Sequence, residues 1–190
     1  FLFGDSVYEV TCTYENVIFK LQEHLDRLWY SASRLALPIL QTRSELTHEL
    51  LKTLGVLNVE SAYIRLVVTR GEGEMTLDPN SAQGNNVVII TRPLQPNPEW
   101  WYSEGVEMLI ADIERIPKES VDPSIKSGNY LNNVLAYSEA RKAGAFDAIM
   151  LNRAGMVTEG TTNNIWRVKN GKVSTPPLKS GLLGGITRKT

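Results

Sequence analysis

Cysteine and histidine are scarce in this sequence of 190 residues. Cys12 is the single cysteine, so no disulfide framework can form within the chain. The two histidines, His24 and His48, stand apart from each other and from Cys12. This scatter argues against a metal site built from histidine and cysteine, and we predict that no metal is bound.

The sequence also has no excess of positive or negative charge. Lysine and arginine number 20 and aspartate and glutamate 21, which gives a net charge of −1 and no argument for a nucleic-acid partner. No apolar run reaches the roughly 18 residues that suggest a membrane span. No signal-peptide pattern is present. We therefore predict a cytoplasmic protein without a membrane partner.

The two ends resemble cut ends. Residue 1 is Phe rather than Met and leads directly into an apparent strand, while Gly185–Arg188 looks like the start of a helix that stops after a few residues. We expect an internal piece of a longer protein, truncated at both ends.

The periodicity of apolar residues predicts a mixed α and β chain with segregated elements, which is the α+β class. Helix 23–37 should end at Pro38, and a Thr42–Glu45 capping box should begin the next helix. Helix 130–142 should bury Leu131, Val134, Leu135 and Ala136. Strands are expected at 7–13, 17–19, 62–69, 87–91, 106–110, 147–151, 156–158, 164–168 and 172–175, the last two joined by an Asn170–Gly171 turn.

Three prolines lie within residues 92–100, which favours a stiff, extended linker. We predict an N-terminal α/β domain at 1–91, lacking its first strands, and part of a larger cofactor-binding domain at 101–190.

Lys126 and Glu159 are the first candidates for chemistry. A lysine is nucleophilic only when deprotonated, and Lys126 stands between an apolar residue and a small-residue loop that could bury it. Glu159 follows a strand, and a carboxylate there could hold the ring nitrogen of pyridoxal phosphate. Taken singly, the ordinary interpretation prevails for each residue, namely a solvated lysine for Lys126 and a polar turn residue for Glu159.

Two segments could bind phosphate. The glycines before Ile186 and Thr187 open a helix, whose free N–H groups attract anions, although an ordinary loop-to-helix junction is as good an interpretation. Arg27 could add a bidentate contact, or could be a surface arginine in a charged helix face. Thr162 and Asn163 offer anion-binding groups of the same kind, or form only a hairpin turn.

Tyr63 and Arg65 are two residues apart on one predicted strand and therefore point the same way. A phenol beside a guanidinium suits a substrate carboxylate. The pair could equally be the exposed face of a half-buried strand.

The joint order of these motifs resembles the class IV, or fold-type IV, pyridoxal-phosphate aminotransferases, which include branched-chain and D-amino-acid aminotransferases. The resemblance covers essentially the whole chain. It rests on segments Phe3–Glu9, His24–Leu28, Val68–Gly71, Lys126 with Asn129–Leu131, Glu159–Gly160 with Asn164, Thr175–Pro177 and Gly185–Arg188.

The resemblance implies a role for each site residue. Lys126 would be the Schiff-base lysine of pyridoxal 5'-phosphate (PLP) and would move the proton between the substrate Cα and C4′ of the cofactor. Glu159 would pair with the ring nitrogen and Tyr130 would hydrogen-bond the phenolic oxygen. Further cofactor contacts would come from Arg27, Thr162, Asn163, Ile186 and Thr187, and substrate contacts from Tyr8, Val10, Tyr63 and Arg65.

The substrate predicted by the resemblance is a branched-chain L-amino acid, with 2-oxoglutarate as the amino acceptor. The D-amino-acid branch carries an arginine and a histidine after its Thr-Arg-Gly motif, and residues 72–78 contain neither, whereas Tyr63–Arg65 matches the Tyr-x-Arg of the branched-chain enzymes. In contrast, Tyr8–Cys12 is closer to the D-amino-acid pattern. The alternatives are a D-amino acid aminotransferase, an aminodeoxychorismate lyase and an inactive scaffold homologue. A homodimer is expected, as in the family.

Overall fold

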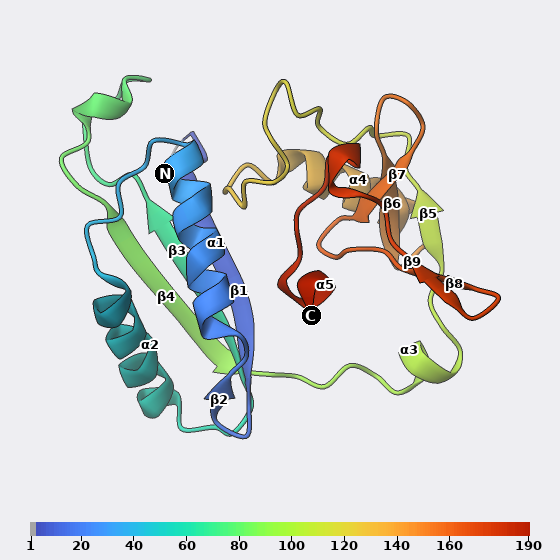
Figure 1. Cartoon of the computed structure of the whole chain (residues 1–190), viewed down its shortest axis with the longest axis horizontal. Helices are drawn as coiled ribbons and strands as arrows, with labels where there is room; N and C mark the ends of the chain where they lie inside the picture. Colours follow the sequence, from blue (N-terminus) through green and yellow to red (C-terminus); the bar gives the residue numbers. More distant parts are fainter. Residues whose placement is uncertain (1–2) are drawn as a thin grey trace. The chain divides into compact units, whose positions relative to one another are not determined.

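The computed structural model describes residues 3–190, which divide into two compact units (Figure 1). The first unit runs to Pro96 and also takes in Ile125–Asn129, and the second comprises Asn97–Ser124 and Tyr130–Thr190. The two units part within the predicted linker. The segment around Lys126 belongs to the first unit and not to the second, which contains most of the predicted 101–190 domain. The predicted mixture of helices and strands is confirmed.

An antiparallel sheet in the order β2-β1-β3-β4 forms the centre of the first unit. Helix α1 packs against β1 and helix α2 against β4 (Figure 1). A short 3-10 turn lies in the loop that joins β3 to β4. The elements are β1 (Ser6–Tyr14), β2 (Val17–Ile18), α1 (Leu21–Arg34), α2 (Arg43–Leu57), β3 (Ala62–Thr69), η1 (Pro79–Ser81) and β4 (Asn86–Pro93).

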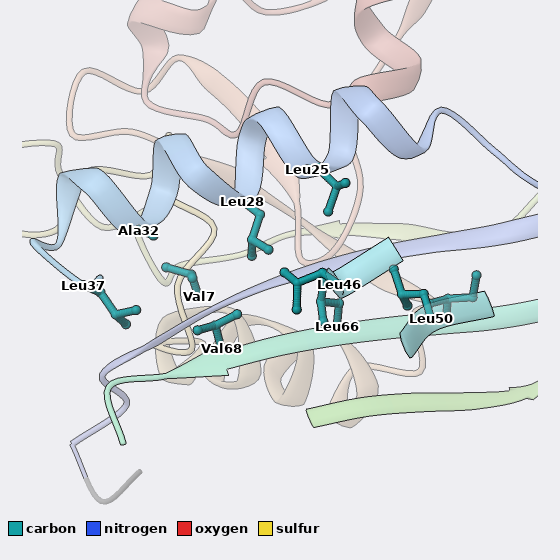
Figure 2. Close-up of a cluster of buried hydrophobic side chains, with 10 residues drawn as sticks. Val7, Leu25, Leu28, Ala32, Leu37, Leu46, Leu50, Leu66 and Val68 are labelled. Atoms are coloured by element: carbon teal, nitrogen blue, oxygen red, sulfur yellow. The ribbon is translucent and has the colours of Figure 1, made fainter. Parts of the chain in front are cut away.

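The hydrophobic core of this unit lies between the sheet and its two helices. Because side chains alternate along a strand, one face of β1 and β3 supplies apolar side chains to this core, to which α1 and α2 add their leucines (Figure 2). Full burial of each such side chain is worth about 1.5–3 kcal/mol. The buried cluster comprises Val7, Leu25, Leu28, Ala32, Leu37, Leu46, Leu50, Ile64, Leu66 and Val68.

Helix α1 ends at Arg34, three residues before the predicted end. Ala36 takes up a left-handed conformation with φ of 47°, and the Leu37 N–H donates to the Ala32 carbonyl at 2.9 Å. This turn satisfies the last helical carbonyls, so the helix has already closed when the chain reaches Pro38. The predicted capping box of α2 is confirmed, with Thr42 Oγ1 accepting from the Glu45 N–H at 3.2 Å.

The second unit contains a three-stranded sheet in the order β5-β6-β7. Strands β5 and β6 are parallel and are joined by the crossover that contains α4, whereas β7 is antiparallel to β6. The predicted hairpin at Asn170–Gly171 is confirmed between β8 and β9, with positive φ at both turn residues. The elements are α3 (Trp100–Ser103), β5 (Met108–Ile110), α4 (Leu131–Lys142), β6 (Asp147–Leu151), β7 (Val157–Gly160), β8 (Arg167–Lys169), β9 (Lys172–Ser174), η2 (Leu178–Ser180) and α5 (Ile186–Lys189).

The predicted apolar side of α4 is confirmed for Ala136, which is buried, but is wrong for its three larger members. Leu131, Val134 and Leu135 are 69%, 55% and 49% exposed, and Asn133 and Ala140 are buried beside Ala136. Alanines on this side allow the helix to lie close to β6, because they add little thickness between the backbones. Small residues accordingly dominate the second core, which comprises Ala111, Ala136, Ala140, Ala145, Ala148 and Met150.

Among residues 3–190, no helix is both long and apolar enough to cross a membrane.

Candidate active site

Lys126 is held by backbone pairing along the edge of β1. Strand β2 pairs only with the far end of β1, at Thr13 and Tyr14, so the beginning of β1 has an open edge. The Lys126 segment occupies it: the Tyr8 N–H donates to the Lys126 carbonyl at 3.0 Å, and the Gly128 N–H to Ser6 at 2.8 Å. These bonds give the half-buried lysine a fixed place on the sheet.

The amine of Lys126 lies over the ring of Tyr8. Its Nζ is 4.4 Å from the ring centroid, and the guanidinium carbon of Arg65 is 4.1 Å from the same centroid. The ring is 4% exposed. The Lys126 amine and the Arg65 guanidinium therefore both lie within cation–π distance of one buried aromatic side chain.

The sheet register explains why these residues meet. Val10 lies opposite Arg65, and Cys12 opposite Tyr63, so their side chains share the sheet face on which Tyr8 also stands. Helices α1 and α2 pack on the other face. The four predicted substrate residues, Tyr8, Val10, Tyr63 and Arg65, are thus gathered on one face, together with the amine of Lys126.

Arg27 lies on the helix side of the sheet, where it forms a buried ion pair with Glu9. Its Nε and Nη2 each donate to one Glu9 oxygen at 2.7 Å, and His24 Nδ1 is 2.7 Å from Glu9 Oε2. Burial raises the pKa of Glu9, but the hydrogen bonds and charges of Arg27 and His24 outweigh it and leave the pKa below its usual 4.5. Arg27 is therefore a buried, paired arginine and not a residue of a solvated face.

Glu159 is the third residue of β7 and is 5% exposed. Its Oε1 accepts from Arg115 Nε at 3.0 Å. Its Oε2 accepts from the Leu183 N–H at 3.1 Å and from Asn164 Nδ2 at 3.4 Å. A carboxylate that accepts from one cation and two neutral donors is fixed in position.

The turn after Glu159 is tied to Asp147. Thr161 Oγ1 donates to Asp147 Oδ1 at 2.6 Å, and Asn163 Nδ2 donates to Asp147 Oδ2 at 2.8 Å. The side chain of Asn163 therefore braces this turn, although Asn163 is exposed, as Thr162 is. Both residues stay predicted cofactor contacts.

The segment before α5 approaches Asn164 closely. A Cβ at Gly185 would lie 2.0 Å from Asn164 Oδ1, so a larger residue at this position would displace the Asn164 amide. Asn164 Nδ2 also donates to the Leu183 carbonyl at 2.9 Å. Because the same amide contacts Glu159, it links the carboxylate to the chain that enters α5, which contains Ile186 and Thr187.

Each unit gathers its own part of the predicted site. Lys126, Arg27 and the four substrate residues are in the first unit, and the second holds Tyr130, Glu159, Thr162, Asn163, Ile186 and Thr187. Sequence reasoning missed Glu9, Arg115 and the bracing role of Asn164. No group of three or more metal-ligating side chains occurs in the part of the chain that the structure describes.

Comparison with known proteins identifies the family. The model of "Amino-transferase class IV" matches residues 6–190. A putative branched-chain-amino-acid aminotransferase of Methanocaldococcus jannaschii is 42% identical over 98% of this chain, and a D-alanine aminotransferase of Bacillus licheniformis is 34% identical over 98%. The chain spans 64% of the length of each of these relatives.

A solved structure supports the same assignment for the fold. The branched-chain amino acid aminotransferase of Escherichia coli superposes with a TM-score of 0.93 at 31% identity, covering 98% of this chain and 64% of that one. The predicted family and the fold-type IV architecture are thereby confirmed. The chain belongs to the class IV aminotransferase family.

Proposed function

We propose that the protein is a PLP-dependent aminotransferase that moves the amino group of branched-chain L-amino acids to 2-oxoglutarate. The observation that carries this proposal is the place of Lys126, whose amine stands on the Tyr8 ring beside Arg65. Backbone pairing holds Lys126 beside the sheet face that carries the predicted substrate residues, and Arg65 is suited to bind the substrate carboxylate.

The residues present fit PLP. Glu159 is buried and accepts hydrogen bonds from three donors, so its carboxylate is held ready as a partner for a protonated pyridine nitrogen. The cofactor, when bound, supplies an electron sink for the substrate Cα. Lys126 would bind it covalently and carry a proton between the substrate Cα and C4′ of the cofactor. Tyr130 would orient the phenolic oxygen.

For the phosphate we propose Arg27, with Ile186 and Thr187 at the start of α5. Glu9 fixes the orientation of the Arg27 guanidinium, so its direction is set before any ligand arrives. Thr162 and Asn163 would contribute from the turn after β7. As in the expected family arrangement, we propose that the protein acts as a homodimer.

A D-amino acid aminotransferase is the second candidate function. Two observations favour it, namely the Tyr8–Cys12 sequence of β1 and the 34% identity to a D-alanine aminotransferase. Against it, residues 72–78 contain neither arginine nor histidine. We found no feature that favours the lyase.

An assay of the full-length protein with L-valine, L-leucine and D-alanine, each with 2-oxoglutarate, tests the proposal. We expect turnover of the two L-amino acids, and turnover of D-alanine alone would contradict our interpretation of Tyr63 and Arg65. Lys126→Ala should abolish the near-visible absorbance of the covalently bound cofactor and lower the rate by at least about 10²–10⁴-fold, the usual contribution of a positioned acid–base group. Lys118→Ala, at a lysine outside the predicted site, is the matched control.

A further inference from the structure

Arg115 is a buried arginine that none of the predicted roles uses. It follows β5, and its N–H donates to the Leu151 carbonyl at the end of β6 at 2.8 Å. Its side chain is 9% exposed. A buried guanidinium is costly unless it is paired and hydrogen-bonded, so its partners indicate why the charge is there.

The partners of Arg115 converge on Glu159. Nε and Nη2 both lie 3.0 Å from Glu159 Oε1. On the other side, Nη1 lies 3.3 Å from Asn132 Oδ1 and 3.4 Å from Asn133 Oδ1. The guanidinium therefore contacts a single carboxylate oxygen with one edge and the beginning of α4 with the other.

The two asparagines are themselves fixed. Asn132 Nδ2 donates to the Glu114 carbonyl at 2.9 Å, and Asn133 Nδ2 donates to the Thr161 carbonyl at 2.6 Å. These bonds turn each amide so that its oxygen faces Arg115. The arginine consequently has a single favourable orientation, with its charge against Glu159.

The charge of Arg115 matters because Glu159 is buried. Burial disfavours an ionised carboxylate, and two further donors to Glu159, Asn164 and the Leu183 N–H, are neutral. Arg115 brings a positive charge into direct contact with the carboxylate. Without it, Glu159 would hold a proton more strongly and would compete with a bound pyridine nitrogen for that proton.

We propose that Arg115 is a positioning residue that keeps Glu159 ionised and thereby keeps the proton on the ring nitrogen of the bound cofactor. This inference rests on the proposed function. It assigns to Arg115 no contact with the cofactor or with the substrate. Its effect should therefore pass entirely through Glu159.

The test uses the full-length protein loaded with PLP that carries ¹⁵N in the ring, whose NMR shift distinguishes a protonated from an unprotonated nitrogen. In the wild type we expect a protonated nitrogen. Arg115→Gln should move the shift toward the unprotonated form and slow the exchange of the substrate Cα proton by at least about tenfold, a modest effect for a perturbed acid–base site. Arg115→Lys restores a positive charge and should keep the nitrogen protonated.

Double variants separate this role from a structural one. In the Glu159→Gln background, Arg115→Gln should change neither the shift nor, beyond about twofold, the exchange rate, because residues that act as one unit are not additive. The double variant also serves if Arg115→Gln alone proves too unstable to study. It removes both charges of the buried pair, so neither is left unpaired. Arg153→Gln, at a surface arginine that is 81% exposed, is the control.

The possible failures are distinguishable. If the wild type takes up no PLP on Lys126, the proposed function fails. If PLP is bound but Arg115→Gln leaves the ring nitrogen as protonated as in the wild type, the role of Arg115 is refuted and the proposed function stands. The role of Arg115 would also be refuted if adding Arg115→Gln to Glu159→Gln slowed the exchange of the substrate Cα proton a further tenfold.

Discussion

Replacing Glu9 by glutamine removes the only negative charge among the three side chains that meet at this buried cluster. Glu9 is 3% exposed. Its carboxylate accepts hydrogen bonds of 2.7 Å from Nε and Nη2 of Arg27, and His24 Nδ1 lies 2.7 Å from Glu9 Oε2. Glutamine has nearly the same shape, so the packing should be kept while Arg27 loses the negative charge of Glu9 beside it. Breaking a buried pair in this way costs about 3–5 kcal/mol, much more than an exposed pair contributes.

Urea unfolding of the cofactor-free protein, followed by circular dichroism, measures this cost. For a chain of this length, about 3–5 kcal/mol corresponds to a fall in Tm of about 6–20 °C. Asp26→Asn is the matched control, because Asp26 also binds an arginine, at 2.6 Å from Arg43, but both side chains are exposed. We expect less than about 1 kcal/mol for that control.

A second substitution tests whether the unpaired charge is the cause. Adding Arg27→Met to Glu9→Gln removes the remaining buried charge, so the double variant should regain at least about 1 kcal/mol over Glu9→Gln. If Glu9→Gln alone costs less than about 1 kcal/mol, then the ion pair does not stabilise the first unit and the reasoning is refuted.

The same pair also makes stability depend on pH. The pKa of Glu9 is lower in the folded protein than its usual 4.5, because Arg27 and His24 outweigh the effect of burial. The folded state therefore binds this proton less readily than the unfolded state, and the contribution of Glu9 is present above pH 4.5. It should be lost as the pH falls through the folded pKa, so the wild type and Glu9→Gln should converge in stability in acid.

Three further predictions concern other parts of the chain. Thr42→Ala should lower the free energy of unfolding by about 0.5–2 kcal/mol, because it removes the cap of α2, and urea unfolding measures it. Gly71→Ala should cost at least about 2 kcal/mol in the same assay, because φ is 108° and the new Cβ would lie 1.7 Å from the Gly84 carbonyl oxygen. Arg65→Gln should raise the KM for L-valine by about 10–100-fold through loss of a charged hydrogen bond, with Arg153→Gln unchanged in steady-state kinetics.

Local signals predicted the elements of the fold well. Strand β3 was expected at 62–69 and spans Ala62–Thr69, and the capping box at Thr42 begins α2. Both signals are local. A run of β-branched residues marks β3, and the capping box joins Thr42 to Glu45, only three residues further along the chain. The end of α1 was misplaced because a left-handed Ala36 closes the helix, and alanine carries no sequence signal for that conformation.

Contacts between distant residues were beyond the reach of such signals. Arg115 is 44 residues from Glu159 and Arg27 is 18 from Glu9, so neither pair could be found from spacing. The face of α4 was misjudged because large apolar residues were expected inside, whereas close packing on β6 selects alanine. The sequence does carry one signal for the Glu9 pair. Glu9 is a charged residue within an otherwise largely apolar strand, and it is buried beside Val7 and Tyr8.

The central claim is that Lys126 binds the cofactor covalently. Reduction of the PLP-loaded full-length protein with borohydride fixes the imine as a stable amine, and peptide mapping by mass spectrometry then locates the modified lysine. We predict the phosphopyridoxyl group on the peptide that contains Lys126 and on no other. A modified peptide elsewhere, or an unmodified protein, would contradict the account.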